Sequence, residues 1–148
     1  MKVLVLGASG MLGNAVFRVF AHSPGYQVFG SVRSSRALRL LANDLQSRVI
    51  EGVDVENIDN LTRLFAVVHP DVVINCVGLV KQLAEAGDPL LAIPINALLP
   101  HRLARLCEVA GARLVHMGTD CVFSGPKGMF TEVDVSDGKD LYGRSLYL

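Results

Sequence analysis

Three glycines near the amino terminus have the spacing of a phosphate-binding turn. Gly7, Gly10 and Gly13 follow an apolar run, Lys2 to Leu6, and open a stretch with helical periodicity. In such a strand–turn–helix the first glycine permits a tight turn, the second lets the backbone approach a diphosphate, and the third allows close helix packing. The helix amino terminus then offers unpaired N–H groups and partial positive charge. The residues predicted to contact a dinucleotide are Gly7, Ser9, Gly10, Met11, Leu12 and Gly13.

The residue that follows the second apolar run favours one cofactor over another. NAD-binding turns of this type have a carboxylate about 20 positions past the glycines, where it binds the ribose 2′-hydroxyl. Here that position holds Arg33, followed by Ser34 and Ser35. A guanidinium and hydroxyl groups suit a 2′-phosphate, so Arg33 and Ser34 are predicted to bind NADP(H) in preference to NAD(H). The alternative, that Arg33 points into solvent, stays open.

Apolar runs alternate with helical patterns along the chain, which is typical of βαβ units and a parallel sheet. We expect strands over residues 2–6, 27–32, 48–53, 71–77 and 112–117. Right-handed crossovers would give a doubly wound α/β sheet, a Rossmann fold, with strand order 3-2-1-4-5. The carboxyl ends of parallel strands meet at one edge, where ligands of such sheets bind.

Helices are expected between the strands, with their apolar residues facing the sheet. A short helix is predicted over residues 35–43, and another begins at Asn57 as its N-cap. In residues 88–110 we expect a helix, a break at Pro94 and Pro100, and a second helix. The side chains predicted to face the sheet are Leu12, Ala15, Val16, Val19 and Phe20, then Ile58, Leu61, Phe65 and Val68, then Leu99, Leu103 and Leu106.

Composition narrows the class of protein and its partners. The chain has 148 residues, 51% of them hydrophobic, with 14 Lys+Arg and 14 Asp+Glu. Balanced charge gives no general attraction to nucleic acid or to an anionic membrane surface. No apolar run approaches the ~20 residues of a membrane span, and the amino terminus does not resemble a signal peptide, so we expect a cytoplasmic protein with no membrane or nucleic acid as a partner. The cysteines and histidines lack metal-ligand spacing, so no metal site is expected.

Six segments together resemble one enzyme family. They are Gly7 to Gly13, Asp54-Val55, Asn75-Cys76-Val77-Gly78, Asn96, the string from Thr119 to Gly125, and Tyr142-Gly143-Arg144-Ser145. In content and order they are similar to motifs of the extended short-chain dehydrogenases/reductases, in the branch of the dTDP-4-dehydrorhamnose reductases. The resemblance implies an NAD(P)-binding Rossmann domain over residues 1–148. It also implies reduction by NADPH of the 4-keto group of a nucleotide-activated deoxysugar, often for cell-surface polysaccharides.

The resemblance also implies roles for individual residues. Tyr142 would protonate the ketone oxygen while the nicotinamide delivers hydride, and Thr119 would hydrogen-bond that oxygen. Further contacts with the cofactor would come from Asp54, Val55, Cys76, Val77, Gly78 and Asn96. Contacts with the sugar nucleotide would come from Asp120, Cys121, Val122 and Phe123.

Two features depart from the family pattern. Leu146 stands where the family has a lysine that lowers the tyrosine pKa and holds the nicotinamide ribose. The chain also ends within the helix expected over residues 142–148, which follows an irregular loop or lid over residues 124–141. The family's sugar-binding part would therefore be absent from this sequence, and we expect the chain alone to be inactive.

Three functions stay open at this point. The first is a ketoreductase of nucleotide sugars, which Thr119 and Tyr142 favour. The second is a noncatalytic NADP-binding regulatory subunit, a class that the same branch contains and that Leu146 favours. The third is a sugar-nucleotide epimerase or dehydratase, which Arg33 disfavours because those enzymes usually carry an acidic residue there. The uncovered edge of the fifth strand also predicts self-association into a homo-oligomer.

Overall fold

Close contacts divide the chain into two compact units, which are described separately. The computed structural model describes residues 1–125 and 127–148. The first unit comprises Met1–Val77 and His101–Met117, and the second comprises Gly78–Pro100 and Gly118–Leu148. A single domain over residues 1–148 stays a prediction. Pro126, which falls within the predicted loop, lies outside the described residues.

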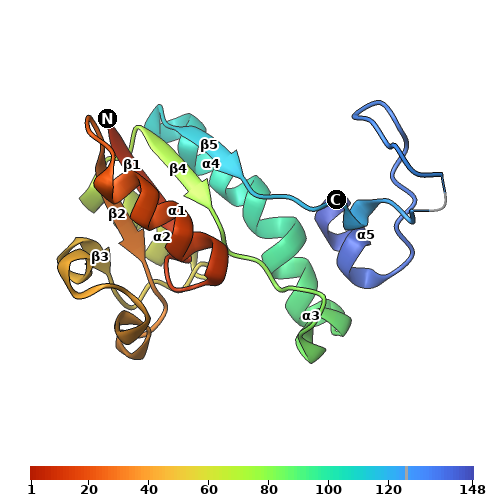
Figure 1. Ribbon diagram of the computed structural model, residues 1–148, viewed down its shortest axis with the longest axis horizontal. Coiled ribbons are helices and arrows are strands. Elements are labelled where there is room, and N and C mark those ends of the chain that lie inside the picture. The colour runs from red at the N-terminus through yellow and green to blue at the C-terminus, as the bar shows by residue number, and fades with distance from the viewer. Residues whose placement is uncertain (126) are drawn as a thin grey trace. The chain divides into compact units, whose positions relative to one another are not determined.

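The first unit holds a five-stranded parallel sheet, as predicted (Figure 1). Its strands are β1 (Lys2–Leu6), β2 (Gln27–Ser31), β3 (Val49–Ile50), β4 (Val72–Asn75) and β5 (Arg113–His116). Their order, β3-β2-β1-β4-β5, confirms the doubly wound α/β topology. β3 is shorter than the predicted strand over 48–53, because Gly52 adopts a φ of +72° and turns the chain out of the extended conformation.

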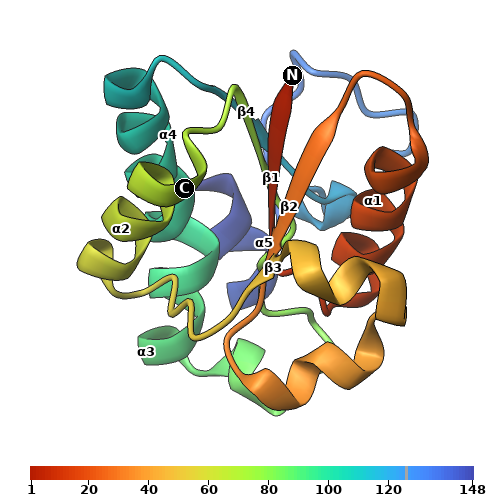
Figure 2. The ribbon, with the colours of Figure 1, turned by 90° about the vertical axis from the view of Figure 1, so that its left-hand side faces the viewer.

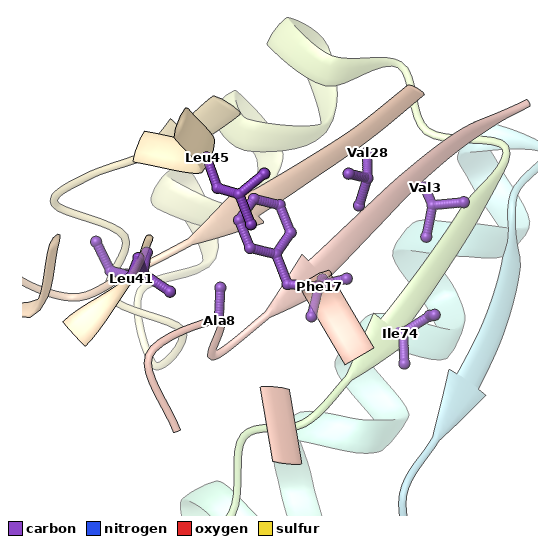
Figure 3. Packing of buried hydrophobic residues seen from close by; sticks show 9 residues of the cluster. Val3, Ala8, Phe17, Val28, Leu41, Leu45 and Ile74 are labelled. Atoms are coloured by element: carbon purple, nitrogen blue, oxygen red, sulfur yellow. The ribbon is translucent and has the colours of Figure 1, made fainter. Parts of the chain in front are cut away.

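One face of this sheet is covered by helix α1 (Met11–His22) and by two 3₁₀ turns, Ser35–Leu40 and Asn43–Arg48 (Figure 2). These turns replace the single short helix predicted over residues 35–43. The buried cluster on this face includes Val3, Ala8, Phe17, Val28, Leu41, Leu45 and Ile74 (Figure 3). The intervening residues of β1, Leu4 and Leu6, are equally buried, because strand side chains alternate between faces and a central parallel strand is covered on both.

Helix α1 is rotated relative to the sequence prediction. Its buried or half-buried positions include Gly13, Val16, Phe17 and Phe20, and its exposed positions include Leu12, Ala15 and Val19. The predicted inward positions Leu12, Ala15 and Val19 are therefore wrong. A Cβ atom added to Gly13 would lie 2.1 Å from the carbonyl oxygen of Gly7. This close approach determines which side of the helix faces the sheet. The spacing of apolar residues in the sequence does not reveal it.

The opposite face of the sheet is covered by α2 (Ile58–Val68) and by α4 (Leu99–Ala110) from His101 onward (Figure 2). Asn57 caps α2 as predicted, since its side chain accepts hydrogen bonds from the N–H groups of Asp59 and Asn60. The predicted inward residues Leu61, Phe65, Val68, Leu99 and Leu103 are buried, and Leu106 is half-buried. The prediction that Ile58 faces the sheet is wrong. Ile58 begins the helix and is 46% exposed, whereas Leu64 is buried.

The helical stretch before β5 has no break at its prolines, contrary to the prediction. α3 (Pro89–Ala92), a π-helical segment (Ile93–Leu98) and α4 follow one another directly, and the residues at both junctions have helical dihedral angles. Proline lacks the N–H that a regular helix needs. Pro94 lies in the first turn of the π-helical segment, and the N–H of Leu99 bonds to its carbonyl, five residues earlier, rather than to that of the next residue.

The second unit ends in helix α5 (Leu141–Tyr147). A 3₁₀ turn at Asp120–Val122 precedes it, and the described residues between 123 and 140 form no helix or strand, in agreement with the predicted loop. The Oδ1 atom of Asp140 accepts a hydrogen bond from the N–H of Gly143 at 2.8 Å. This cap starts the helix one residue before Tyr142, close to the predicted start.

Candidate functional site

The glycine turn joins β1 to α1 at the carboxyl edge of the sheet. Gly7 has a φ of +76°, a left-handed conformation that favours glycine. The N–H of Gly10 donates to the carbonyl of Gly7 at 3.0 Å, and the N–H of Asn14 donates to the carbonyl of Gly10 at 2.8 Å. With Gly13 packed on the Gly7 carbonyl, the fold itself requires glycine at positions 7 and 13.

Gly10 differs from the other two glycines, because the fold does not require it. It is exposed, and an added Cβ atom would meet only the Gly7 carbonyl oxygen, at 3.4 Å. Its φ of −71° and ψ of 162° are open to any residue. Gly10 is the N-cap of α1, and no side chain of the described residues caps this helix. The helix amino terminus and the bare backbone at Gly10 therefore fit a dinucleotide diphosphate.

The side chains predicted to bind the adenosine end follow β2 and β3. Arg33 and Ser34 are exposed beyond β2, and Asp54 is exposed beyond β3 with Val55 half-buried beside it. Asp54 accepts a hydrogen bond from the N–H of Glu56 at 3.1 Å. Within the described residues the Arg33 guanidinium takes part in no ion pair. A phosphate is therefore not in competition with an internal carboxylate for Arg33.

Cys76 and Val77 leave β4 beside the glycine turn. The N–H of Cys76 donates to the carbonyl of Leu6 at 3.1 Å. A Cβ atom added to Gly7 would lie 3.0 Å from Cγ2 of Val77. The structure thus brings together predicted residues that are far apart in the sequence. Burial raises the pKa of the Cys76 thiol, so this side chain is protonated at neutral pH and suits a lining role rather than a nucleophilic one.

In the second unit the Thr119 segment lies against the helix that carries Tyr142. The Oγ1 atom of Thr119 accepts a hydrogen bond from the N–H of Cys121 at 3.2 Å, which fixes the turn. A Cβ atom added to Gly143 would lie 2.3 Å from the carbonyl oxygen of Cys121. Glycine directly after the tyrosine is therefore what lets turn and helix meet. Thr119 and Tyr142, both half-buried, belong to the two segments so joined.

Of the residues predicted to bind the sugar nucleotide, some contact the loop that follows them and one is exposed. The carbonyl of Val122 accepts the N–H of Gly138 at 2.8 Å, and the ring of Phe123 stacks on that of Phe130 with centroids 4.4 Å apart. These two residues anchor the loop that follows them. Asp120 is exposed and could offer its carboxylate to a ligand. The substrate contacts stay predictions.

The amide of Asn96, predicted to contact the cofactor, is occupied within the second unit. Asn96 is buried in the π-helical segment. Its Oδ1 atom accepts from the N–H of Leu79 at 2.9 Å, and its Nδ2 atom donates to the Leu79 carbonyl at 3.1 Å and to Oγ of Ser145 at 3.3 Å. Asn96 therefore fixes the segment after Gly78 to α5. An effect on a cofactor would act through that segment.

Lys81 was missed by the sequence analysis. Its Nζ atom lies 2.6 Å from Oδ2 of Asp140, the cap of α5. The pKa of Lys81 is raised, first by the hydrogen bond and charge of Asp140 and to a smaller extent by the charges of Cys121 and Tyr142. Lys81 is thus a cation paired with the cap of the helix that carries Tyr142, whereas Leu146 is apolar and half-buried. No motif marks Lys81, because it lies in an irregular segment far from Tyr142 in sequence.

The remaining groups with reactive side chains form no further cluster. Burial raises the pKa of the Cys107 thiol to about 11, so it stays protonated at neutral pH. Among residues 1–125 and 127–148, no three His, Cys, Asp or Glu side chains are placed to hold a metal ion. None of the helices described there has the length and apolar character needed to span a bilayer.

This chain is similar in sequence to one protein family and to several known proteins. The family model of the RmlD substrate-binding domain matches residues 1–148. The beta subunit of methionine adenosyltransferase 2 from Rattus norvegicus is 27% identical over 144 residues, which are 97% of this chain and 40% of that protein. A probable low-salt glycan biosynthesis reductase, Agl14, from Haloferax volcanii is 29% identical over 146 residues, which are 98% of this chain and 46% of that protein.

A solved structure shares the fold. The dTDP-4-dehydrorhamnose reductase from Bacillus anthracis in complex with NADP matches 99% of this chain and 46% of its own, with 25% identity and a TM-score of 0.74. The chain thus spans 40% to 46% of the length of these proteins. Because the family model matches the whole chain and the sheet order and glycine turn agree with it, the chain belongs to the RmlD-like branch of the extended short-chain dehydrogenases/reductases.

Proposed function

We propose that this chain is the NADP(H)-binding part of a reductase of nucleotide-activated 4-keto-deoxysugars. The observation that carries the proposal is Gly10, a glycine that the fold does not need and a diphosphate does. Arg33, outside any ion pair of the described residues, supports the phosphorylated cofactor. The related reductase of Bacillus anthracis, which is in complex with NADP, supports both the cofactor and the class of reaction.

Two residues of the second unit would handle the ketone. Bound NADPH would supply a hydride to the carbonyl carbon. The phenolic O–H of Tyr142 would give its proton to the carbonyl oxygen, and the hydroxyl of Thr119 would donate a hydrogen bond to the same oxygen. The Thr119 hydroxyl now faces the Asp120 carboxylate at 3.5 Å, a long contact that a substrate oxygen can replace.

A noncatalytic, NADP-binding regulatory subunit is the second candidate. Leu146 favours it, because an apolar side chain replaces the lysine of the family motif. Similarity to a beta subunit of methionine adenosyltransferase also favours it. The close contact between the segments of Thr119 and Tyr142 at Gly143 favours the reductase.

Calorimetry with NADPH, followed by turnover with a dTDP-4-keto-deoxysugar, tests the proposal. We expect binding by the 148-residue chain and a loss of at least about tenfold in Gly10→Ala, since a methyl group there displaces the diphosphate. Oxidation of NADPH in step with sugar reduction supports the reductase. Because the chain alone is expected to be inactive, binding without oxidation supports the cofactor-binding role and does not separate the reductase from the regulatory subunit, whereas sugar conversion without net NADPH consumption supports an epimerase. No binding at saturating NADPH would contradict both the reductase and the NADP-binding regulatory subunit.

A further inference from the structure

Two polar side chains at the carboxyl ends of β4 and β5 form a pair that the proposed function does not use. Asn75 and His116 end these strands and face each other in register. Asn75 is fully buried. Its Nδ2 atom lies 3.1 Å from Nδ1 of His116, and its Oδ1 atom accepts the N–H of Val77 at 3.1 Å.

The donors and acceptors allow only one arrangement of this pair. The N–H of Val77 can only donate, so the amide oxygen of Asn75 must face it. The amide NH2 of Asn75 then points to Nδ1 of His116, which must carry a lone pair. His116 is therefore neutral, with its proton on Nε2. A proton on Nδ1 would set two donors against each other, and turning the amide over would set NH2 against the N–H of Val77.

The pair leads directly to the glycine turn. Val77 follows the strand by two residues and its side chain faces Gly7, where an added Cβ atom would come within 3.0 Å of Cγ2. The carbonyl of Asn75 also accepts the N–H of Met117 at 3.2 Å, so the main chain of the two strands is joined at this point. The position of Val77 beside Gly7 thus depends on the amide of Asn75, which in turn depends on His116.

We propose that Asn75 and neutral His116 are a positioning pair for the dinucleotide, holding Val77 against the glycine turn. This inference rests on the proposed function. Burial lowers the pKa of His116, which keeps the ring neutral at pH 7. The group facing the ring from β4 is the uncharged Asn75. The nearest charged residues of the two strands, Asp71 before β4 and Arg113 in β5, stand at their amino ends.

The test is dinucleotide affinity between pH 8 and pH 5.5 in four versions of the 148-residue chain. Because the pKa of His116 is lowered, wild type should begin to bind more weakly only as pH falls below the ordinary histidine value of about 6.5, by at most tenfold per pH unit for one proton. His116→Gln offers an amide oxygen that does not titrate, so affinity at pH 8 should be near wild type and should fall less toward pH 5.5. His116→Ala should bind about 3- to 10-fold more weakly at pH 8, as one lost hydrogen bond would give. The exposed His22→Gln should behave as wild type.

The 2′-phosphate of NADP also titrates, near pH 6. The decisive quantity is therefore the difference between wild type and His116→Gln with the same ligand. The amide nitrogen signal of Val77, followed by NMR in the chain without ligand, should titrate in wild type and not in His116→Gln. Identical pH profiles with an unmoved Val77 signal would overturn the positioning pair and leave the proposed function standing. Absence of binding by wild type at pH 8 would overturn the proposed function and this inference with it.

Discussion

The two units hold their candidate residues by different kinds of contact. In the first unit the glycine turn is fixed by main-chain atoms, with Gly13 packed on the carbonyl of Gly7. In the second unit the helix that carries Tyr142 also has a close main-chain contact, Gly143 on the Cys121 carbonyl, but it depends in addition on two side chains, the amide of Asn96 and the carboxylate of Asp140. Substitutions that keep the glycines leave the main-chain contacts of the first unit in place. In the second unit, substitution of a single residue such as Asn96 or Asp140 removes its hydrogen bonds.

This difference bears on the two proposed functions, a reductase and a noncatalytic NADP-binding subunit. In the proposed function the diphosphate would bind to backbone N–H groups, so this part of the binding would tolerate most substitutions outside the glycines. Proton transfer by Tyr142 would need charged and polar neighbours, and a single substitution, such as leucine for the family lysine at position 146, would alter them. We therefore expect substitutions in this fold to abolish catalysis more readily than cofactor binding.

The largest expected effect is that of Gly13→Ala on folding. The new methyl group would meet the Gly7 carbonyl oxygen at 2.1 Å, a contact with rigid main chain, so we expect a loss of at least about 3 kcal/mol in the free energy of unfolding. Gly10→Ala is the matched control and should change stability by less than about 1 kcal/mol. Urea unfolding followed by circular dichroism measures both. Equal losses in the two variants would refute the distinction between a glycine of the fold and a glycine of the ligand.

Asn96→Ala probes the second unit in the same way. Removal of the amide leaves the N–H and carbonyl of Leu79 without their partner, so we expect a loss of about 2–3 kcal/mol. Ser145→Ala removes the contact with Asn96 and the hydrogen bond from the serine hydroxyl to the Tyr142 carbonyl, but it leaves both main-chain groups of Leu79 bonded and should cost less. Hydrogen exchange gives the readout: the Leu79 amide should exchange faster in Asn96→Ala, while the amides of β1 keep their protection. Uniform acceleration across both units would show that they open together.

The order of the sheet and the glycine turn could be predicted because each has a local signature. Apolar runs of strand length record β1 and β4, and glycine spacing records the turn. The rotation of α1 could not be predicted, because it depends on the close approach of Gly13 to the carbonyl of Gly7. The uninterrupted helix through Pro94 could not be predicted either. Its π turn is defined by which backbone carbonyl accepts each N–H, and the pattern of side chains does not determine this.

Contiguous motifs are what the sequence offers for predicting the candidate site, whose residues stay predictions. The Thr119 string and Tyr142 were found from their own residues, whereas Lys81 and the Asn75–His116 pair depend on partners distant in sequence. Asn96 was found by its motif, but its buried amide bonds Leu79 and Ser145. Sequence thus indicated which residues matter more readily than what each one contacts.

Arg33→Ala tests whether the first unit discriminates between cofactors by one side chain. We expect NADPH to bind about 10- to 100-fold more weakly, because a charge-assisted hydrogen bond to the 2′-phosphate is lost, and NADH to bind as before. Arg36→Ala, a neighbouring exposed arginine, is the control and should leave both affinities unchanged. Calorimetry with the two nucleotides measures the ratio. An unchanged ratio in Arg33→Ala would assign the arginine to solvent.

The smallest expected effect concerns the cap of α5. The hydrogen bond from Lys81, and after it the bond from the N–H of Gly143, lower the pKa of the Asp140 carboxyl. A lowered pKa means that the carboxylate stabilises the fold above its unfolded value, near 3.9, and that this contribution is lost as pH falls through the folded-state pKa. Asp140→Asn keeps an oxygen for Gly143 but removes the charge, so its thermal midpoint should lie below wild type at pH 7 and converge with it below pH 3.

The control and the contrary outcome follow from the exposure of this ion pair. The side chains of Lys81 and Asp140 are 58% and 43% exposed, so salt should shrink the difference between wild type and Asp140→Asn. Asp140→Ala also removes the cap acceptor and should unfold at a lower temperature than Asp140→Asn. Glu51→Gln, which removes an exposed carboxylate after β3, should leave the midpoint unchanged. A gap between wild type and Asp140→Asn that persists below pH 3 would mean that the carboxylate charge is not what stabilises the start of the helix that carries Tyr142.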